Sequence, residues 1–180
     1  MNFRRVAIVA LSLVLWACAP ATRVQSNKAQ DYANEPKRVF VLTDVGSDFG
    51  DEYAQAFQER LTGIAKDCGA VLEVSRVSSL ELDNSARTTR MNEFKPDVVL
   101  SIFRAGGTRN QYGLFHVIYD ARLQDVESKK LVWRANFSFH RGGGLIPIAD
   151  RGRALAVDIT NRMKQDGIVR SCPVIKPAAS

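Results

Sequence analysis

The sequence predicts a single α/β domain in which a mixed sheet of about five strands is packed by two to three helices. Three observations support this prediction. The length of 180 residues suffices for one domain of ordinary size. A hydrophobic fraction of 46% with 24% charged residues is typical of a chain that buries a core. Short β-branched runs also alternate with segments of helical periodicity, in the order β-α-β-α-β-β-β-α.

The chain opens with the pattern of a signal peptide over residues 1–17. Arg4 and Arg5 precede an apolar run of 12 residues that ends at Ala17. As a helix this run would span about 18 Å, which is shorter than a hydrocarbon core of roughly 30 Å. We therefore expect it to be a removed signal and not a permanent membrane span.

Cys18 is the expected lipidation site, because Leu15-Trp16-Ala17-Cys18 resembles the bacterial lipobox. Several acyl chains would hold the protein durably on a membrane, at roughly 0.8 kcal/mol per buried CH₂. The next residue is Ala19, whereas an Asp there would resemble an inner-membrane retention signal. The prediction is therefore an outer-membrane protein facing the periplasm. The alternative is an ordinary secretory signal cleaved near Ala19.

The mature chain divides into three predicted parts. Residues 18–36 combine the lipidated cysteine with a polar stretch that reads as a flexible tether, about 23 Å long as a coil. Residues 37–170 form the globular α/β domain, and residues 171–180 form a C-terminal tail.

The first half of the domain alternates strands and helices. Residues 38–43, 71–75 and 97–103 are the predicted strands. Tyr53, Phe57, Leu61 and Ile64 form one apolar stripe, which predicts a helix that ends at Gly69. Residues 80–93 are a weaker helical segment.

The second half reads as a hairpin followed by a helix. A glycine-rich turn at Ala105–Thr108 precedes a predicted strand over 112–123, and a polar turn at 127–130 leads to the return strand over 131–139. A last helix is predicted from about 150 to 165.

The segment from Tyr119 to Phe139 resembles the hairpin of small bacterial envelope lipoproteins, in which Leu-Val-Trp-Arg, here residues 131–134, brings the chain back. Together with the element order, the domain is similar to the α/β fold shared by the amino-terminal domain of TolB, the curli-secretion lipoprotein, the activator lipoproteins of penicillin-binding proteins and the Pel exopolysaccharide lipoprotein. The resemblance implies a non-enzymatic part of an envelope machine, often oligomeric or docked onto a partner.

The function expected is that of an accessory or structural lipoprotein in an envelope assembly or export system, binding an envelope protein or an acidic polymer. A homo-oligomer is possible. Nucleic acid is a poor candidate because the anchor keeps the protein outside the cytoplasm. The candidate contact residues lie around a basic, glycine-rich loop and in the hairpin; they are Arg141, Gly142, Gly143, Gly144, Arg151, Arg153 and Trp133.

Catalytic groups are sparse, so we expect no enzyme, no metal site and no cofactor. His116 and His140 are the only histidines, and two isolated histidines do not supply a zinc site. A periplasmic hydrolase acting on peptidoglycan or polysaccharide, with Asp44, Asp48 or Asp51 as acid and base, is one alternative. A small-ligand binder with a pocket near the loops is another.

Cys68 and Cys172 remain as a pair once Cys18 is lipidated. The periplasm permits a disulfide between them, which would close a loop of about 100 residues and contribute at most about 5 kcal/mol. Two unpaired buried thiols are the alternative.

Overall fold

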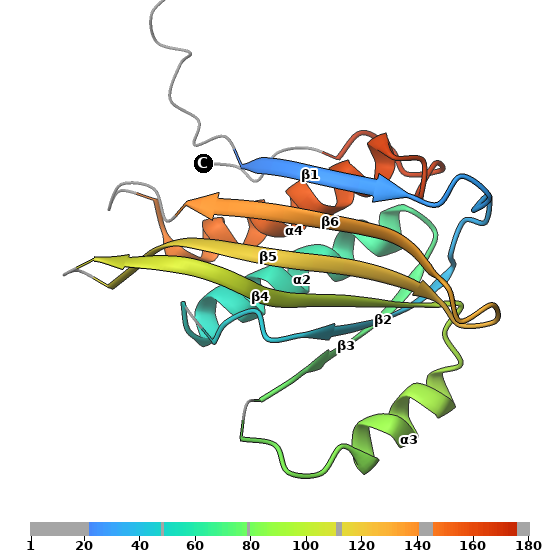
Figure 1. Cartoon of the computed structure of the whole chain (residues 1–180), viewed down its shortest axis with the longest axis horizontal. Coiled ribbons are helices and arrows are strands. Elements are labelled where there is room, and N and C mark those ends of the chain that lie inside the picture. The colour runs from blue at the N-terminus through green and yellow to red at the C-terminus, as the bar shows by residue number, and fades with distance from the viewer. Residues whose placement is uncertain (1–21, 48, 79, 111–112, 141–145, 176–180) are drawn as a thin grey trace, which may run out of the picture.

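The computed structural model describes residues 22–47, 49–78, 80–110, 113–140 and 146–175. These residues form one sheet and three helices (Figure 1). The elements in chain order are β1 (Arg23–Lys28), β2 (Arg38–Thr43), α2 (Asp51–Asp67), β3 (Val71–Arg76), α3 (Ser85–Phe94), β4 (Val98–Asn110), β5 (Gly113–Asp125), β6 (Leu131–His140) and α4 (Ile148–Gln165).

The sheet is mixed, as predicted, with the strand order β1-β6-β5-β4-β2-β3. Strand β2 pairs in parallel with both β3 and β4, because helical crossovers precede each of these two strands. The other neighbours pair antiparallel. The predicted element order is confirmed from β2 to α4, and β1 is an additional sixth strand.

Strand β1 corrects the prediction of a flexible tether where it occupies residues 23–28 of the predicted range 18–36, whereas the signal segment 1–17 and Cys18 lie outside the described residues. The strand pairs antiparallel with β6 from Arg23, opposite Ser138, to Lys28, opposite Trp133. The segment is polar and lacks apolar periodicity because an edge strand is held mainly by backbone hydrogen bonds to its single neighbour. Only alternate side chains of β1 turn toward the body of the protein, and Val24 alone among these packs against the hydrophobic core.

Helices α2 and α4 pack side by side on one face of the sheet, and the core lies between them and the strands (Figure 1). Gly152 of α4 allows the close approach of the two helices. A Cβ atom at this position would lie 2.3 Å from the carbonyl oxygen of Tyr53 in α2, which is closer than atoms can approach. The glycine therefore sets the distance between the helices.

Helix α3 lies on the opposite face, over the β2–β3 edge of the sheet. Phe40 alternates with the core residues of β2, so it turns away from α2, and its ring lies 6.0 Å from that of Phe94. Arg90 of α3 donates a hydrogen bond to Ser75 of β3. Helix α3 has no buried residue of its own, which agrees with its weak apolar stripe.

Strand β4 extends through the glycine-rich segment that was predicted to turn. Residues Ala105–Thr108 remain in the strand, and its pairing with β5 shifts register between Arg104 and Gly106. Glycine in a strand is typical of such a bulge, since it tolerates the local bend. The turn prediction was therefore wrong, and the glycines mark an irregularity within a long strand.

The predicted disulfide is present: Cys68, just after α2, is bonded to Cys172. The bridge fixes the start of the C-terminal tail against the domain. Ser171 adds to this attachment, because its backbone N–H and its hydroxyl both donate to Glu35. Among the described residues, no helix is both long and apolar enough to cross a bilayer.

Candidate interaction surface on the open sheet face

Four strands of the sheet carry helices on one face only. Helices α2 and α4 lie behind β1, β6, β5 and β4, whereas α3 covers only the β2–β3 edge on the other side (Figure 1). We call the outward surface of these four strands the open face. Within the described residues, no helix lies over it. A solvent-facing sheet of this extent is the main surface feature of the fold.

Alternation along β5 assigns its side chains to the two faces. Val117, Tyr119, Ala121 and Leu123 are fully buried beneath α2 and α4. The side chains between them, which belong to the open face, are His116, Ile118, Asp120, Arg122 and Gln124. Strand β6 contributes Arg134, Asn136 and Ser138 to the same face, as its register with β5 requires. The open face is therefore predominantly polar.

Asp120 is the centre of the open face and is 8% exposed. Arg134 of β6 donates from Nε to Oδ1 of Asp120 at 2.9 Å, and Arg122 donates from Nε to Oδ2 at 2.7 Å. Burial alone would raise the pKa of Asp120, but the hydrogen bonds from Arg134 and Arg122 outweigh it and hold the pKa below its ordinary value. The cluster is thus a fixed, ionised carboxylate between two guanidinium groups.

His116 links the other end of the open face across three strands. Its Nε2 lies 2.7 Å from the hydroxyl of Ser138 in β6, and its Nδ1 lies 3.3 Å from the hydroxyl of Thr108 in β4. These contacts occupy both ring nitrogens. His116 and Asp120 lie two side-chain positions apart on one face, so β5 alone does not bring them into an acid–base pair.

Two of the predicted contact residues lie inside the protein, which corrects their assignment. Trp133 is 1% exposed and packs in the core, because on β6 it alternates with the outward Arg134. Arg151 is 6% exposed on α4, next to the tight helix contact at Gly152. Neither offers a surface to a partner.

The remaining predicted contact residues have different outcomes. Arg153 is partly exposed and forms a salt bridge of 2.6 Å with Asp150 on the same helix. Arg141, Gly142, Gly143 and Gly144 lie outside the described residues. The basic loop as a contact segment therefore stays a prediction.

The structure gives the described acidic candidates structural contacts. Asp44 accepts hydrogen bonds from the backbone N–H of Arg104 at 3.0 and 3.2 Å, which joins the loop after β2 to β4. Asp51 is exposed at the start of α2 and forms a salt bridge of 2.8 Å with Arg76. Asp48 lies outside the described residues. Within the described part of the chain, no three His, Cys, Asp or Glu residues are grouped to hold a metal ion.

Sequence reasoning missed the open face as a candidate interaction surface, although the signal was available. Alternate side chains of β5 are apolar, and the side chains between them include His116 and Asp120. This alternation predicts that one face of the strand is buried and the other is exposed to solvent. The pairing of Asp120 with Arg134 depends on the register between β5 and β6, which is set by the turn at residues 126–130.

The described structure defines a single-domain α+β protein built on a mixed sheet with one largely uncovered face. The fold is similar to that of the PelC chain from Paraburkholderia phytofirmans, a protein solved as a dodecamer. This chain matches it with a TM-score of 0.53 and 12% sequence identity, over 83% of this chain and 98% of that chain. At this low identity, the structural match shows a shared fold alone.

A variant of the PelC dodecamer in a second crystal form gives a TM-score of 0.50 at 13% identity, over 74% of this chain and 91% of that chain. A DUF330 protein from Xanthomonas campestris gives a TM-score of 0.42 at 10% identity, over 83% of this chain and 93% of that chain. No family model and no curated protein sequence matches the chain. Of the resemblances expected from the sequence, the one to the Pel exopolysaccharide lipoprotein is supported by the structural matches to PelC. The resemblances to TolB and to the curli and penicillin-binding-protein lipoproteins stay predictions.

Proposed function

We propose that this protein is a lipid-anchored accessory or structural component of an envelope assembly or export system, and that it acts by binding and not by catalysis. The observation that carries the proposal is the open face. It is a preformed array of charged and polar groups on four strands, and its central carboxylate is already held by two arginines. Such a surface costs little reorganisation when a partner docks on it.

The partner that we propose for the open face is a second copy of this chain within a closed homo-oligomer. The solved PelC chains that share the fold are dodecamers, which supports a ring. Most soluble homo-oligomers have closed symmetry, and a head-to-tail contact repeated between copies forms a ring when the rotation between neighbouring copies closes. An envelope protein or an acidic polymer would then meet the assembled ring.

The anchor in this proposal is Cys18, with the domain on the periplasmic side of the outer membrane. Strand β1 begins at Arg23. Four residues separate it from Cys18, so the two Cα atoms lie at most about 18 Å apart. An acylated Cys18 would therefore hold the domain against the membrane surface.

The test is in-envelope crosslinking of the full-length protein, followed by native mass measurement and identification of captured proteins. A Cys18→Ser variant is the control for the anchor. We expect a homo-oligomer of defined stoichiometry, with envelope partners that are lost in the control. A monomer without partners in its own envelope would overturn the proposal.

A matched pair of substitutions tests the open face itself. Asn136→Arg adds a bulky cation at the centre of the open face, directly opposite Asp120 and two positions from Arg134 on β6. Gln55→Arg adds the same cation on the exposed side of α2. We expect Asn136→Arg to weaken self-association at least tenfold in sedimentation, while Gln55→Arg leaves it unchanged. Equal association of the two variants would exclude the open face as the contact.

A further inference from the structure

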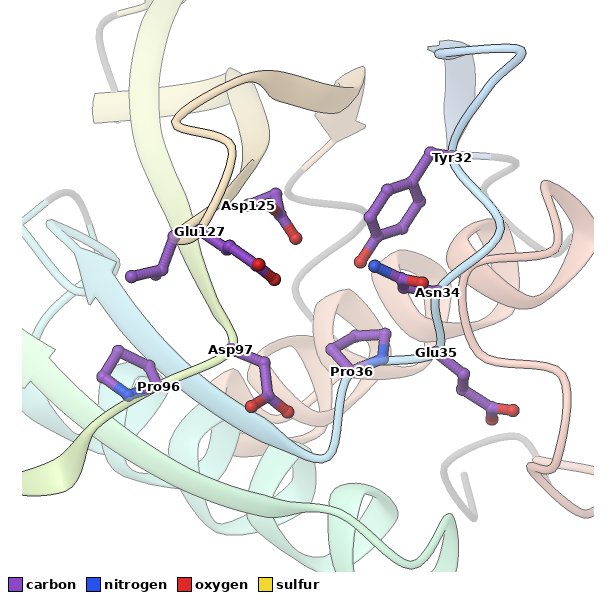
Figure 2. A pocket seen from close by; sticks show the side chains of 9 residues that line it. Tyr32, Asn34, Glu35, Pro36, Pro96, Asp97, Asp125 and Glu127 are labelled. Atoms are coloured by element: carbon purple, nitrogen blue, oxygen red, sulfur yellow. The ribbon is translucent and has the colours of Figure 1, made fainter.

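A second surface feature lies at the end of the sheet where β2 and β4 begin and β5 ends. Here the residues between β1 and β2, the residues before β4 and the turn after β5 enclose a pocket of about 450 Å³ (Figure 2). An adjoining hollow of about 390 Å³ shares Tyr32, Asn34, Asp125 and Glu127 with it. The pocket lining consists of Tyr32, Asn34, Glu35, Pro36, Pro96, Asp97, Asp125, Val126 and Glu127.

The pocket is acidic although the chain is basic. Its lining includes four carboxylates, from Glu35, Asp97, Asp125 and Glu127, and no lysine or arginine. Glu35 forms an ion pair of 3.8 Å with Lys37 outside the lining, so the negative charge comes mainly from the other three. The formal net charge of the whole chain is +6. Carboxylates gathered around a concave surface focus a negative potential there, so the pocket attracts cations.

Two of these carboxylates are held rigidly and keep one oxygen available. Oδ2 of Asp97 accepts from the backbone N–H groups of Lys37 and Arg38 at 2.8 and 2.9 Å. Oδ1 of Asp125 accepts from the backbone N–H and the hydroxyl of Ser128 at 2.8 and 2.7 Å. Among the described residues, the second oxygen of each carboxylate has no hydrogen-bond partner.

Tyr32 supplies the observation that points to a ligand. Its side chain is 7% exposed, and its hydroxyl has no hydrogen-bond partner within the described part of the chain. Figure 2 shows this hydroxyl directed into the pocket, toward the side on which Asn34 and Asp125 lie. Buried hydroxyl groups are normally paired, so an unpaired one that faces a pocket indicates a missing partner.

The Tyr32 hydroxyl stays neutral at every physiological pH. Burial, together with the negative charges of Asp125 and Asp97, raises the pKa of Tyr32 to about 12. Its oxygen can therefore accept a hydrogen bond from a cation while its proton is available to an acceptor such as a neighbouring carboxylate.

We propose that this pocket binds an alkylammonium group. An ammonium ion has three N–H donors, and the lining offers acceptors for them in the Tyr32 oxygen and the available oxygens of Asp97 and Asp125. Among the described residues, no three or more His, Cys, Asp or Glu side chains are grouped to hold a metal ion. The alkylammonium group can come from a free amine or from the lysine side chain of a protein.

The test uses the full-length protein in detergent at low salt, titrated by calorimetry and by thermal shift. The probes are 1,4-diaminobutane for a free amine and Nα-acetyl-lysine methylamide for a lysine side chain, with 1-pentanol as the neutral comparison. We expect at least one ammonium probe to saturate one site and the alcohol to show no binding. Saturation by only one of the two identifies the source of the ammonium group.

Variants locate the binding in the pocket. Tyr32→Phe keeps the ring and removes the hydroxyl, and Glu127→Gln removes an exposed charge, so it leaves the fold intact. Each should weaken ammonium binding about fivefold or more, while Glu52→Gln, a matched change at the start of α2, should not. Binding of neither probe, equal binding of the alcohol, or full affinity in both pocket variants would overturn the proposal.

Discussion

The indole Nε1 of Trp133 donates a hydrogen bond to Oδ2 of Asp166, 2.7 Å away. The hydroxyl of Ser26 in β1 donates to the same oxygen at 2.5 Å. One carboxylate directly after α4 therefore joins the hairpin, the edge strand and the C-terminal helix. The tryptophan that the sequence marks in the hairpin is a structural residue at this junction.

Replacement of Trp133 by Phe should destabilise the protein by about 2 kcal/mol, because it leaves a cavity in the core and removes one partner of Asp166. Urea unfolding measures this free energy, with the wild-type protein as reference. Oligomer formation at temperatures below the transition should be unchanged, since the residue is buried. A loss of assembly without a loss of stability would mean that Trp133 contacts a partner after all.

Removal of the Cys68–Cys172 bridge should lower the free energy of unfolding by about 2–4 kcal/mol, since the bond restricts the unfolded chain between residues separated by 104 positions. The measurement is urea unfolding of the Cys68→Ala/Cys172→Ala double variant. Wild-type protein treated with reductant should show the same loss. If reductant leaves the wild-type unfolding curve unchanged, the bridge contributes nothing to stability.

Gly152→Ala should destabilise the protein by about 1–3 kcal/mol, because the added methyl group would meet the backbone of α2 at Tyr53. Gly63→Ala is the matched control. It lies on the exposed side of α2 with no atom within 4 Å of the added Cβ, so it should stabilise by about 0.5–1 kcal/mol. Thermal melts distinguish the two, and equal melting temperatures would contradict the close packing of α2 on α4.

Acid should lower the free energy of unfolding partly through Asp120, because the pKa of this carboxyl group in the folded protein is below its ordinary value of 3.8. A carboxyl group with a lowered folded pKa stabilises the fold above its unfolded pKa, and this contribution is lost as the pH falls through the folded pKa. Asp120→Asn should therefore be less stable than wild type at pH 7, and the difference should shrink below about pH 4. Urea midpoints measured from pH 7 to pH 2 test this, and a constant difference would contradict it.

The sequence predicted most of the fold because each buried element carries its own periodicity. Tyr53, Phe57, Leu61 and Ile64 are all buried on α2, and the apolar face of the hairpin is buried as the alternation of β5 requires. Strand β1 escaped prediction because its stability comes from β6 and from polar contacts such as that of Ser26 with Arg162 of α4, which leave no local apolar pattern.

The site was harder to predict than the fold. Arg141 and Arg151 were assigned to one contact surface because both are basic and lie close together in the chain. Whether such an arginine is exposed depends on which side of its helix it occupies, and Arg151 lies on the buried side of α4. Neither the pairing of Asp120 with Arg134 nor the gathering of Asp97, Asp125 and Tyr32 in one pocket is visible in local sequence. These groups come from separate segments and meet only through strand register and strand order.

Strand β1 also determines how the protein withstands mechanical force. The chain enters β1 at Arg23, so tension transmitted through residues 19–22 along the strand loads its hydrogen bonds to β6 in shear, all at once. The inward side chains add a second row of attachments, since Thr22, Ser26 and Lys28 bond to Asp158, Asp166 and the carbonyl of Gly167. A leading segment held in this way acts as a clamp, and a load along the strand must break both rows together before the domain begins to unravel.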